Sequence, residues 1–477
     1  MKISRNRRAA APAIYFLAVT GLLYLSFSGW AYDDPFITYR YAENLASGIG
    51  FVYNPGERIL STTTPLFTLL LAGFKSLAPS PHQLAVLVGA GSIAAGSLCL
   101  WDLSRTWKTP VVGWAALALY PTSSLLASTL SSETPLYLAL CLAAFAAYAR
   151  RSFLPAALLA ALATLTRPDA LVLAAILIVH HVAIERRLPS SKTAAAFVLP
   201  LLAWAIFAWT YFGSPIPATL DAKQGQALLQ SSRGFLDGFG SILLGFSERP
   251  WFALPAALAV AGLVRLFHRR QWLLFLAWPA AYFAAFTLLE VTSYFWYYTP
   301  LLPGLVILIG LGLDGLTVWL GDRRLLGLRA GVLAALALIV LAAAFQLADL
   351  AEMRASPDSR LPVYRAAGEW LRQNVPGNSL VGALEVGIIG YYARNPMLDF
   401  SGLIQPEVAA VFSPDSTYED SALWAVETYR PESLVLQKGL MPRLEARLAE
   451  HLCRIDLLLP GARYGYEHDL AVYNCRP

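Results

Sequence analysis

The sequence predicts a polytopic α-helical membrane protein that ends in a small α/β domain. Of its 477 residues, 57% are hydrophobic and only 14% are charged, whereas a soluble domain carries about a quarter charged residues. Apolar stretches of about 20 residues recur from Ile14 to about Gln346, and each is long enough to cross the hydrocarbon layer as a helix. Beyond Met353 the composition becomes mixed and charged, which is typical of a domain in water.

Basic residues give the predicted helices an orientation, because Lys and Arg beside membrane helices remain in the cytoplasm. With the amino terminus and its Lys2 inside, eleven helices keep each later basic cluster inside as well. The clusters are Arg105 with Lys108, Arg150 with Arg151, Arg186 with Arg187 and Lys192, Arg265 with Arg269 and Arg270, and Arg323 with Arg324 and Arg329. The helices are predicted at about 13–31, 83–103, 110–130, 134–149, 153–166, 169–185, 194–212, 251–267, 271–289, 297–320 and 328–347.

One apolar stretch, residues 65–78, is left out of this count. It is short and interrupted by Lys75, so we expect a helix that lies in the outer interface. Counting it as a span would place Arg105 and Lys108 outside. The first stretch follows a basic segment but runs into polar sequence without a cleavage site, so we expect a membrane helix and not a signal peptide.

The eleven-helix arrangement predicts two domains in the plasma membrane. Residues 1–350 form the membrane domain, with a long first outer loop at 31–82 and shorter outer loops around 131–133 and 167–169. Residues 351–477 form an extracytoplasmic α/β domain, in which 364–374 is typical of a helix and 379–383 and 433–436 are typical of buried strands. The net charge of +5 reflects the basic clusters, so the lipid bilayer is an expected partner and nucleic acid is not.

Four cysteines divide in the same way. Cys99 and Cys141 fall in predicted membrane helices, where packing is their ordinary role. Cys453 and Cys475 are the only pair in the outer domain, where oxidation can occur. A disulfide between them is predicted, and two unrelated thiols are the alternative, because sequence carries no information on their geometry.

The first outer loop carries two adjacent acids directly after the first predicted helix. Asp34 can cap a helix whose first position is Pro35 and which Gly48 ends. Capping does not explain Asp33, and two neighbouring carboxylates can raise one pKa toward that of a general base. From the residues alone, a structural and a catalytic role for this pair remain open.

Residues 33–45 and 48–58 resemble the first outer loop of bacterial GT-C glycosyltransferases, closest to the arabinofuranosyltransferase-like branch. Further matches lie at 132–136, 165–169 and 211–223, and a looser one lies at 385–392. The sequence departs from the branch in two places. Ala218 stands where relatives have Asn, and 61–64 replaces a stretch containing Gly-Tyr-Thr, so sugar recognition is expected to differ.

The resemblance implies an inverting transferase. It would move arabinofuranose, mannose or a similar sugar from a polyprenyl-phosphate donor to an extracytoplasmic glycan, lipid or protein acceptor. The resemblance implies that an acid of the Asp33–Asp34 pair deprotonates the acceptor hydroxyl, and we assign Asp33 as the base and Asp34 as an orienting group. Because the leaving group is already a phosphate, no second acid, metal or cofactor is required.

Five further residues are candidates for the site. Glu133 resembles the family's second acidic position, although it could cap the next helix. Arg167 and Lys223 are candidates for the lipid phosphate, although Arg167 could belong to a turn and Lys223 could be solvated. Tyr297 could stack on the sugar, although an interfacial aromatic belt is the default for it. Arg40 lies one and a half turns after the acids and is a candidate substrate-binding residue.

Two other classes of protein compete with this interpretation. A transporter or lipid-carrier flippase would also have many helices, but such proteins usually show paired repeats and midplane ionisable groups. Here the acids gather in outer loops. A noncatalytic assembly partner is the third class. The transferase hypothesis predicts that Asp33, Asp34, Glu133 and Lys223 converge on one outward-facing cavity.

Overall fold

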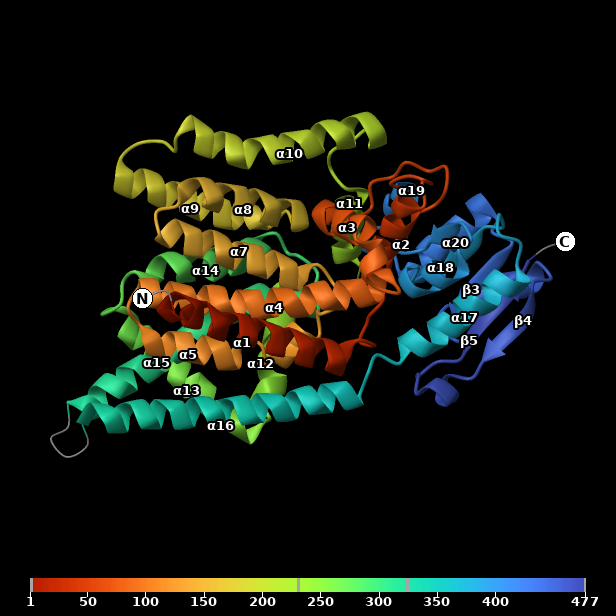
Figure 1. The fold of residues 1–477 in the computed structure, drawn as a ribbon. Coiled ribbons are helices and arrows are strands. Elements are labelled where there is room, and N and C mark those ends of the chain that lie inside the picture. The colour runs from red at the N-terminus through yellow and green to blue at the C-terminus, as the bar shows by residue number, and fades with distance from the viewer. Residues whose placement is uncertain (1–2, 230–231, 323–326, 476–477) are drawn as a thin grey trace.

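The computed structural model describes residues 3–229, 232–322 and 327–475, so the predicted cytoplasmic cations Lys2, Arg323 and Arg324 lie outside the described part. A bundle of long helices lies beside a smaller unit that contains a sheet, and the chain ends in that unit (Figure 1). The long bundle helices are α1 (Ile3–Phe27), α4 (Pro81–Thr106), α5 (Pro110–Leu119), α7 (Thr134–Ala149), α8 (Phe153–Thr166), α9 (Ala170–Glu185), α10 (Ser191–Phe212), α13 (Ala253–Leu266), α14 (Trp272–Leu288), α15 (Leu302–Gly321) and α16 (Gly327–Ala355).

Each of the eleven predicted helices overlaps one of these elements. The largest difference is at 110–130, where α5 ends at Leu119 and the separate short α6 (Ser124–Ala127) follows. Pro121 stands between them and cannot continue a helix, because it lacks the N–H and its ring clashes with the preceding turn. Five helical segments of the described chain are both long and apolar enough to cross a membrane, so the count of eleven crossings and their orientation stay predictions.

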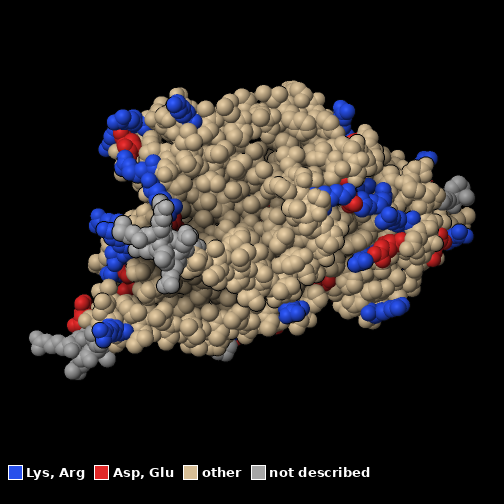
Figure 2. Space-filling model, in the orientation of Figure 1, with Lys and Arg blue, Asp and Glu red and all other residues tan. Residues whose placement is uncertain are grey.

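The predicted interfacial stretch 65–78 contains α3 (Pro65–Gly73) and the short η1 (Lys75–Leu77). The nine residues of α3 rise about 14 Å, which is less than half of a hydrocarbon layer of about 30 Å. Figure 2 shows a broad uncharged surface over the bundle. Lys and Arg gather mainly at two places, the end of the bundle far from the sheet and the sheet-containing unit. Both features agree with helices surrounded by lipid.

Glycines let the bundle helices approach closely. Gly262 of α13 lies against the backbone carbonyl of Leu308 in α15, and Gly312 of α15 lies against that of Leu258 in α13. A β-carbon at either glycine would overlap the opposing carbonyl oxygen. Small residues at a crossing are a common means of packing helices where lipid removes the hydrophobic driving force.

The carboxyl-terminal unit is a five-stranded sheet with the order β2-β1-β3-β5-β4. The predicted strands 379–383 and 433–436 contain β1 (Val381–Ala383) and β3 (Ser433–Gln437), which pair in parallel. β2 (Met397–Asp399) pairs with β1 in parallel, while β5 (Leu470–Asn474) is antiparallel to β3 and to β4 (Arg454–Leu459). The helices are α17 (Arg360–Asn374), α18 (Gly387–Ala393), α19 (Pro406–Ala409), α20 (Tyr418–Tyr429) and α21 (Pro442–Glu450).

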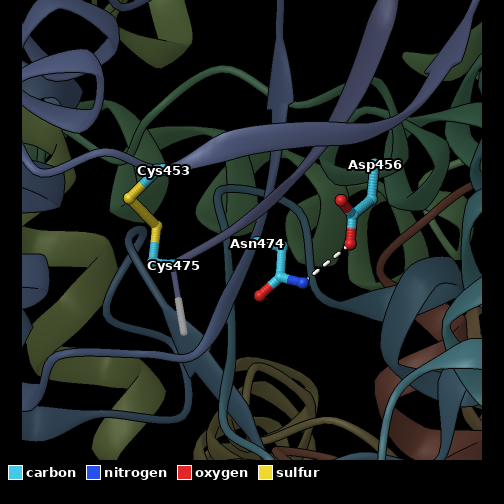
Figure 3. Close-up of a disulfide and its surroundings, with 4 residues drawn as sticks. All are labelled: Cys453, Asp456, Asn474 and Cys475. Atoms are coloured by element: carbon cyan, nitrogen blue, oxygen red, sulfur yellow. Dashed lines mark hydrogen bonds between the residues drawn. A yellow bond between two sulfur atoms is a disulfide. The ribbon is translucent and has the colours of Figure 1, made fainter. Parts of the chain in front are cut away.

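The predicted disulfide between Cys453 and Cys475 is confirmed. The two Cα atoms lie 4.3 Å apart, next to the paired ends of β4 and β5 (Figure 3). Beside the bridge, the Asn474 amide donates a hydrogen bond to Asp456 at 2.7 Å (Figure 3). The bridge therefore closes one edge of the sheet.

The first outer loop connects the bundle and the sheet-containing unit. Its helix α2 (Pro35–Ala46) is buried along most of its length and packs against α18 (Figure 1). One hydrophobic cluster includes Phe36 and Tyr39 of α2, Leu84 of α4, and Ile388 and Val381 of the carboxyl-terminal unit. The two units therefore share a core at this junction.

Candidate active site

Asp33 lies at the junction and caps a helix far away in the sequence. Its carboxylate accepts hydrogen bonds from the backbone N–H groups of Gly387 at 3.0 Å and Ile388 at 2.7 Å, in the first turn of α18. These are amides that an α-helix leaves without partners. Gly387 is required there, because a β-carbon would overlap the backbone and carboxylate oxygens of Asp33.

This environment differs from the one expected for a general base. Asp33 is 6% exposed, and both carboxylate oxygens already accept a backbone N–H, so these contacts argue against Asp33 as the base, whose assignment stays a prediction. Burial raises the pKa of Asp33 well above its usual range, and the charges of Glu385 and Asp34 act in the same direction. The raised pKa reflects burial in a structural contact.

Arg40, the predicted substrate-binding residue, is bound by the protein itself. It is 2% exposed and donates hydrogen bonds to the backbone carbonyls of Tyr53 at 2.9 Å, Gly390 at 2.8 Å and Asn395 at 2.7 Å. These partners join the first outer loop to the end of α18 and the segment after it. The guanidinium of Arg40 is thus occupied by protein carbonyls, and a role in substrate binding stays a prediction.

Asp34 points elsewhere. It precedes α2 but makes no side-chain capping hydrogen bond, and its side chain is 40% exposed. Its Oδ2 lies 3.8 Å from Nζ of Lys223, which comes from α11 (Ala218–Leu228). Nζ of Lys223 also lies 4.0 Å from the ring centre of Tyr294, so the lysine is held by an acid and an aromatic face.

Glu133 and Arg167 form a second charged pair. Glu133 precedes α7 without capping it, and its Oε1 lies 3.6 Å from Nη1 of Arg167. Arg167 is 6% exposed and also pairs with Asp169 at 2.7 Å. The guanidinium lies 5.5 Å from the ring centre of Tyr297, so the predicted aromatic residue faces the predicted cation.

These residues form one electrostatic neighbourhood, which we call the charged face: Asp34, Glu133, Arg167, Lys223 and Tyr297. Burial raises the pKa of Glu133; the charge of Arg167 opposes this and the charge of Asp34 adds to it. Five separate parts of the chain therefore contribute these side chains, whereas a shared outward-facing cavity stays a prediction.

The structure adds residues that sequence reasoning missed. Asp169 is the second acid that pairs with Arg167. Its position in the family-like stretch 165–169 was the sequence feature that could have identified it. Tyr32 stacks on Trp296, with ring centres 5.2 Å apart, and Tyr294 stacks on the other side of the pair at 4.6 Å. Tyr418 comes from the carboxyl-terminal unit and lies near enough to Lys223 and Asp34 for their charges to act on it. No local sequence pattern could have predicted that Tyr418 lies beside the charged face.

No metal-binding cluster is present in the described part of the chain. Across residues 3–229, 232–322 and 327–475, no group of three or more His, Cys, Asp or Glu side chains is placed to share an ion. The charged face instead combines two acids, two cations and aromatic rings. Such a set can accept a proton and stabilise a departing anion.

Two crystal structures of ArnT from Cupriavidus metallidurans resemble the chain over almost its whole length. The form bound to undecaprenyl phosphate has a TM-score of 0.65 at 17% identity and covers 97% of this chain and 98% of that chain. The apo form has a TM-score of 0.63 at 16% identity and covers 98% of each. The apo oligosaccharyltransferase of Archaeoglobus fulgidus has a TM-score of 0.60 at 15% identity and covers 88% of this chain and 69% of that chain.

Comparison by sequence is less informative. Residues 351–472 match a family described as a domain of unknown function (DUF8728). No curated protein matches the chain. The structural likeness extends through both the bundle and the sheet-containing unit, and the chain therefore shares the fold of these solved structures.

Proposed function

We propose that the protein is an inverting membrane glycosyltransferase that takes a sugar from a polyprenyl-phosphate donor. The observation that carries the proposal is the pairing of the partly exposed Asp34 with Lys223 at 3.8 Å, on the first outer loop of a GT-C fold. A structural neighbour with this fold was crystallised with undecaprenyl phosphate, which supports a lipid-phosphate ligand here.

In the proposed reaction, Asp34 takes the proton of an acceptor hydroxyl as its oxygen attacks the anomeric carbon. The bond between that carbon and the donor phosphate breaks, and its electron pair leaves with the polyprenyl phosphate. Lys223 stabilises the negative charge that develops on the phosphate. Attack on the face opposite the leaving group inverts the anomeric centre.

Arg167 and Glu133 then have positioning roles. Asp169 and Glu133 together already offset the positive charge of Arg167, so Lys223 is the better cation for the phosphate. Arg167 fixes Glu133 beside the site and presents Tyr297 to the sugar. We propose no metal or other cofactor in this step.

The proposal also includes the orientation of the chain. Because Asp33 bonds to the backbone of Gly387, the first outer loop and the carboxyl-terminal unit lie on the same side of the membrane. We propose that this side is extracytoplasmic, with residues 1–350 forming the membrane domain and 351–477 the outer domain. The acceptor would then be an envelope glycan, lipid or protein.

The test uses the purified full chain in lipid nanodiscs, with labelled polyprenyl-phosphate arabinofuranose and mannose as donors. The proposal predicts release of polyprenyl phosphate and transfer of the label to an envelope acceptor fraction. In sealed vesicles, movement of intact donor across the membrane, with the sugar–phosphate bond preserved, would instead support the flippase alternative and contradict the transferase.

A further inference from the structure

Gln226 is a buried polar residue that follows Lys223 by about one turn of α11. It is 2% exposed, whereas Gln224 in the same helix is exposed. Residues three positions apart on a helix are neighbours on its surface, so the side chains of Lys223 and Gln226 leave α11 on the same side. The proposed reaction uses Lys223 but does not explain why an amide is buried beside it.

Both ends of the Gln226 amide are bonded, and they bond to two different parts of the chain. Nε2 donates a hydrogen bond to the backbone carbonyl of Ser401 in the carboxyl-terminal unit, at 2.9 Å. Oε1 accepts a hydrogen bond from the hydroxyl of Tyr294, which lies between α14 and α15, at 3.2 Å. Because a backbone carbonyl can only accept, the amide has one orientation, and the Tyr294 hydroxyl donates its proton to Gln226.

The ring of Tyr294 connects this amide to the charged face. Nζ of Lys223 lies 4.0 Å from the centre of the ring, within the range at which a cation is attracted to an aromatic face, and 3.8 Å from Oδ2 of Asp34. The ring also stacks on Trp296, with ring centres 4.6 Å apart. The stack restricts the tilt of the ring, and the hydrogen bond to Gln226 restricts its sliding. Gln226 therefore helps to set where the ring meets the ammonium group.

The carboxyl-terminal unit holds the helix that carries these side chains. α11 packs beside α19 of this unit (Figure 1), and Gly225 approaches Phe412 so closely that a β-carbon would lie 2.9 Å from the ring. Ser401 is itself fixed, because its N–H and its hydroxyl both donate to Oδ1 of Asp399, at 2.8 Å and 2.6 Å. The position of Lys223 is therefore set from the carboxyl-terminal unit as well as from the membrane domain.

We propose that Gln226 is a positioning residue that holds the ring of Tyr294 against Lys223, so that the ammonium group is placed to receive the lipid phosphate. The inference rests on the proposed function, in which that phosphate is the ligand of Lys223. A purely structural role for Gln226 is the alternative. The two differ in one respect: positioning acts through Lys223, so its effect on phosphate binding disappears when the ammonium group is removed, whereas a structural effect persists.

The test measures the Kd of undecaprenyl phosphate for the full chain, by displacement of a fluorescent polyprenyl-phosphate analogue in detergent micelles. Gln226→Met keeps the size of the side chain and removes both hydrogen bonds, so the Kd should rise about threefold to tenfold. Tyr294→Phe keeps the ring and removes one hydrogen bond, so the Kd should rise about twofold to fivefold, and this variant serves if Gln226→Met does not fold. Gln224→Met, the same substitution at an exposed position of α11, should keep the Kd within about twofold of the wild type.

The same substitutions are then made in the Lys223→Ala background. There Gln226→Met and Tyr294→Phe should each change the Kd by less than about twofold, because the group that they position is gone. Equal fold-changes in both backgrounds would show a structural role and overturn the proposal, as would a wild-type Kd in both single variants. These two results concern binding alone and leave the proposed transfer standing, whereas a wild type that binds no undecaprenyl phosphate would overturn both.

Discussion

At the junction, Asp33 and Arg40 are 6% and 2% exposed, and their polar atoms bind the backbone of α18 and its neighbours. On the charged face, which begins one residue later, Asp34 is 40% exposed and its closest cation lies at 3.8 Å. The first arrangement leaves nothing for a substrate to bind, while the second leaves a carboxylate and an ammonium group free to change partners. Adjacent acids in one motif can therefore have different roles, and the satisfaction of their hydrogen bonds distinguishes the roles.

The largest expected effect is on the charged face. Asp34→Asn removes the proposed base without changing the shape of the side chain, so kcat should fall by about 10²- to 10⁴-fold while the melting temperature stays within error of the wild type. Steady-state release of polyprenyl phosphate measures this. Asp237→Asn, at an exposed acid in the first turn of α12 (Phe235–Ser247), should keep wild-type kcat. An equal loss of kcat in this variant would show that the assay reports on general damage to the protein.

At the junction, the largest effect should come from Arg40. Arg40→Met keeps the length of the side chain but removes hydrogen bonds to three buried carbonyls. Those of Tyr53 and Gly390 keep donors from Asn44 and Arg394, while the Asn395 carbonyl loses its donor, and the change should cost about 3 kcal/mol of unfolding free energy. Arg58→Met is the matched control, because Arg58 is exposed and only lies over the ring of Tyr211 at 4.6 Å. That change should cost less than about 1 kcal/mol. Equal costs in denaturant titrations would contradict the structural role of Arg40.

Asp33→Asn should have a smaller effect on stability and should alter its pH dependence. One amide of α18 loses its acceptor, at a cost of about 1–3 kcal/mol. Burial raises the folded-state pKa of Asp33, so the folded chain holds this proton more tightly than the unfolded chain. Wild-type stability should therefore decrease as the pH rises from about 4 through the folded-state pKa.

Asparagine does not titrate, so Asp33→Asn should lack that part of the pH dependence. Thermal unfolding between about pH 4 and pH 8 measures the difference. If wild type and variant showed the same slope, Asp33 would not be the buried titrating group that the structure indicates.

The smallest predicted effect concerns donor binding. Lys223→Ala removes the cation proposed to hold the phosphate, so the donor Kd should rise about tenfold, and the difference should shrink at high salt. Lys75→Ala provides a control, because Lys75 is exposed and its ammonium group donates a hydrogen bond to the Ser47 hydroxyl at 3.4 Å. Unchanged donor binding in Lys223→Ala would move the phosphate site away from the charged face.

A structural feature can be predicted from the sequence when the residues that form it are close together along the chain. Helices such as α4 and α10 are predicted by local apolar runs. The disulfide is predicted because Cys453 and Cys475 are the only two cysteines in the predicted outer domain. The contact of Asp33 with Gly387 joins residues 354 positions apart, and no local pattern encodes it. The family-like stretches at 33–45 and 385–392 indicated two special segments, but not that they bind each other.

The same limit applies to the choice of the base. A resemblance marks residues that a fold or a reaction requires and does not separate the two requirements. The basic clusters assign the loops of Lys223 and Glu133 to one side of the membrane, which stays a prediction. The choice between Asp33 and Asp34 depends on the direction in which two adjacent side chains leave the backbone, which only the three-dimensional structure defines.

The most direct test is the ratio of single-turnover rate constants for Asp33→Asn and Asp34→Asn, measured with saturating polyprenyl-phosphate sugar at a temperature where both remain folded. The structure predicts that Asp33→Asn transfers the sugar within about tenfold of the wild-type rate and that Asp34→Asn is at least about 100-fold slower than the wild type. The reverse ranking, with Asp33→Asn inactive and Asp34→Asn active, would contradict the separation of the junction from the charged face.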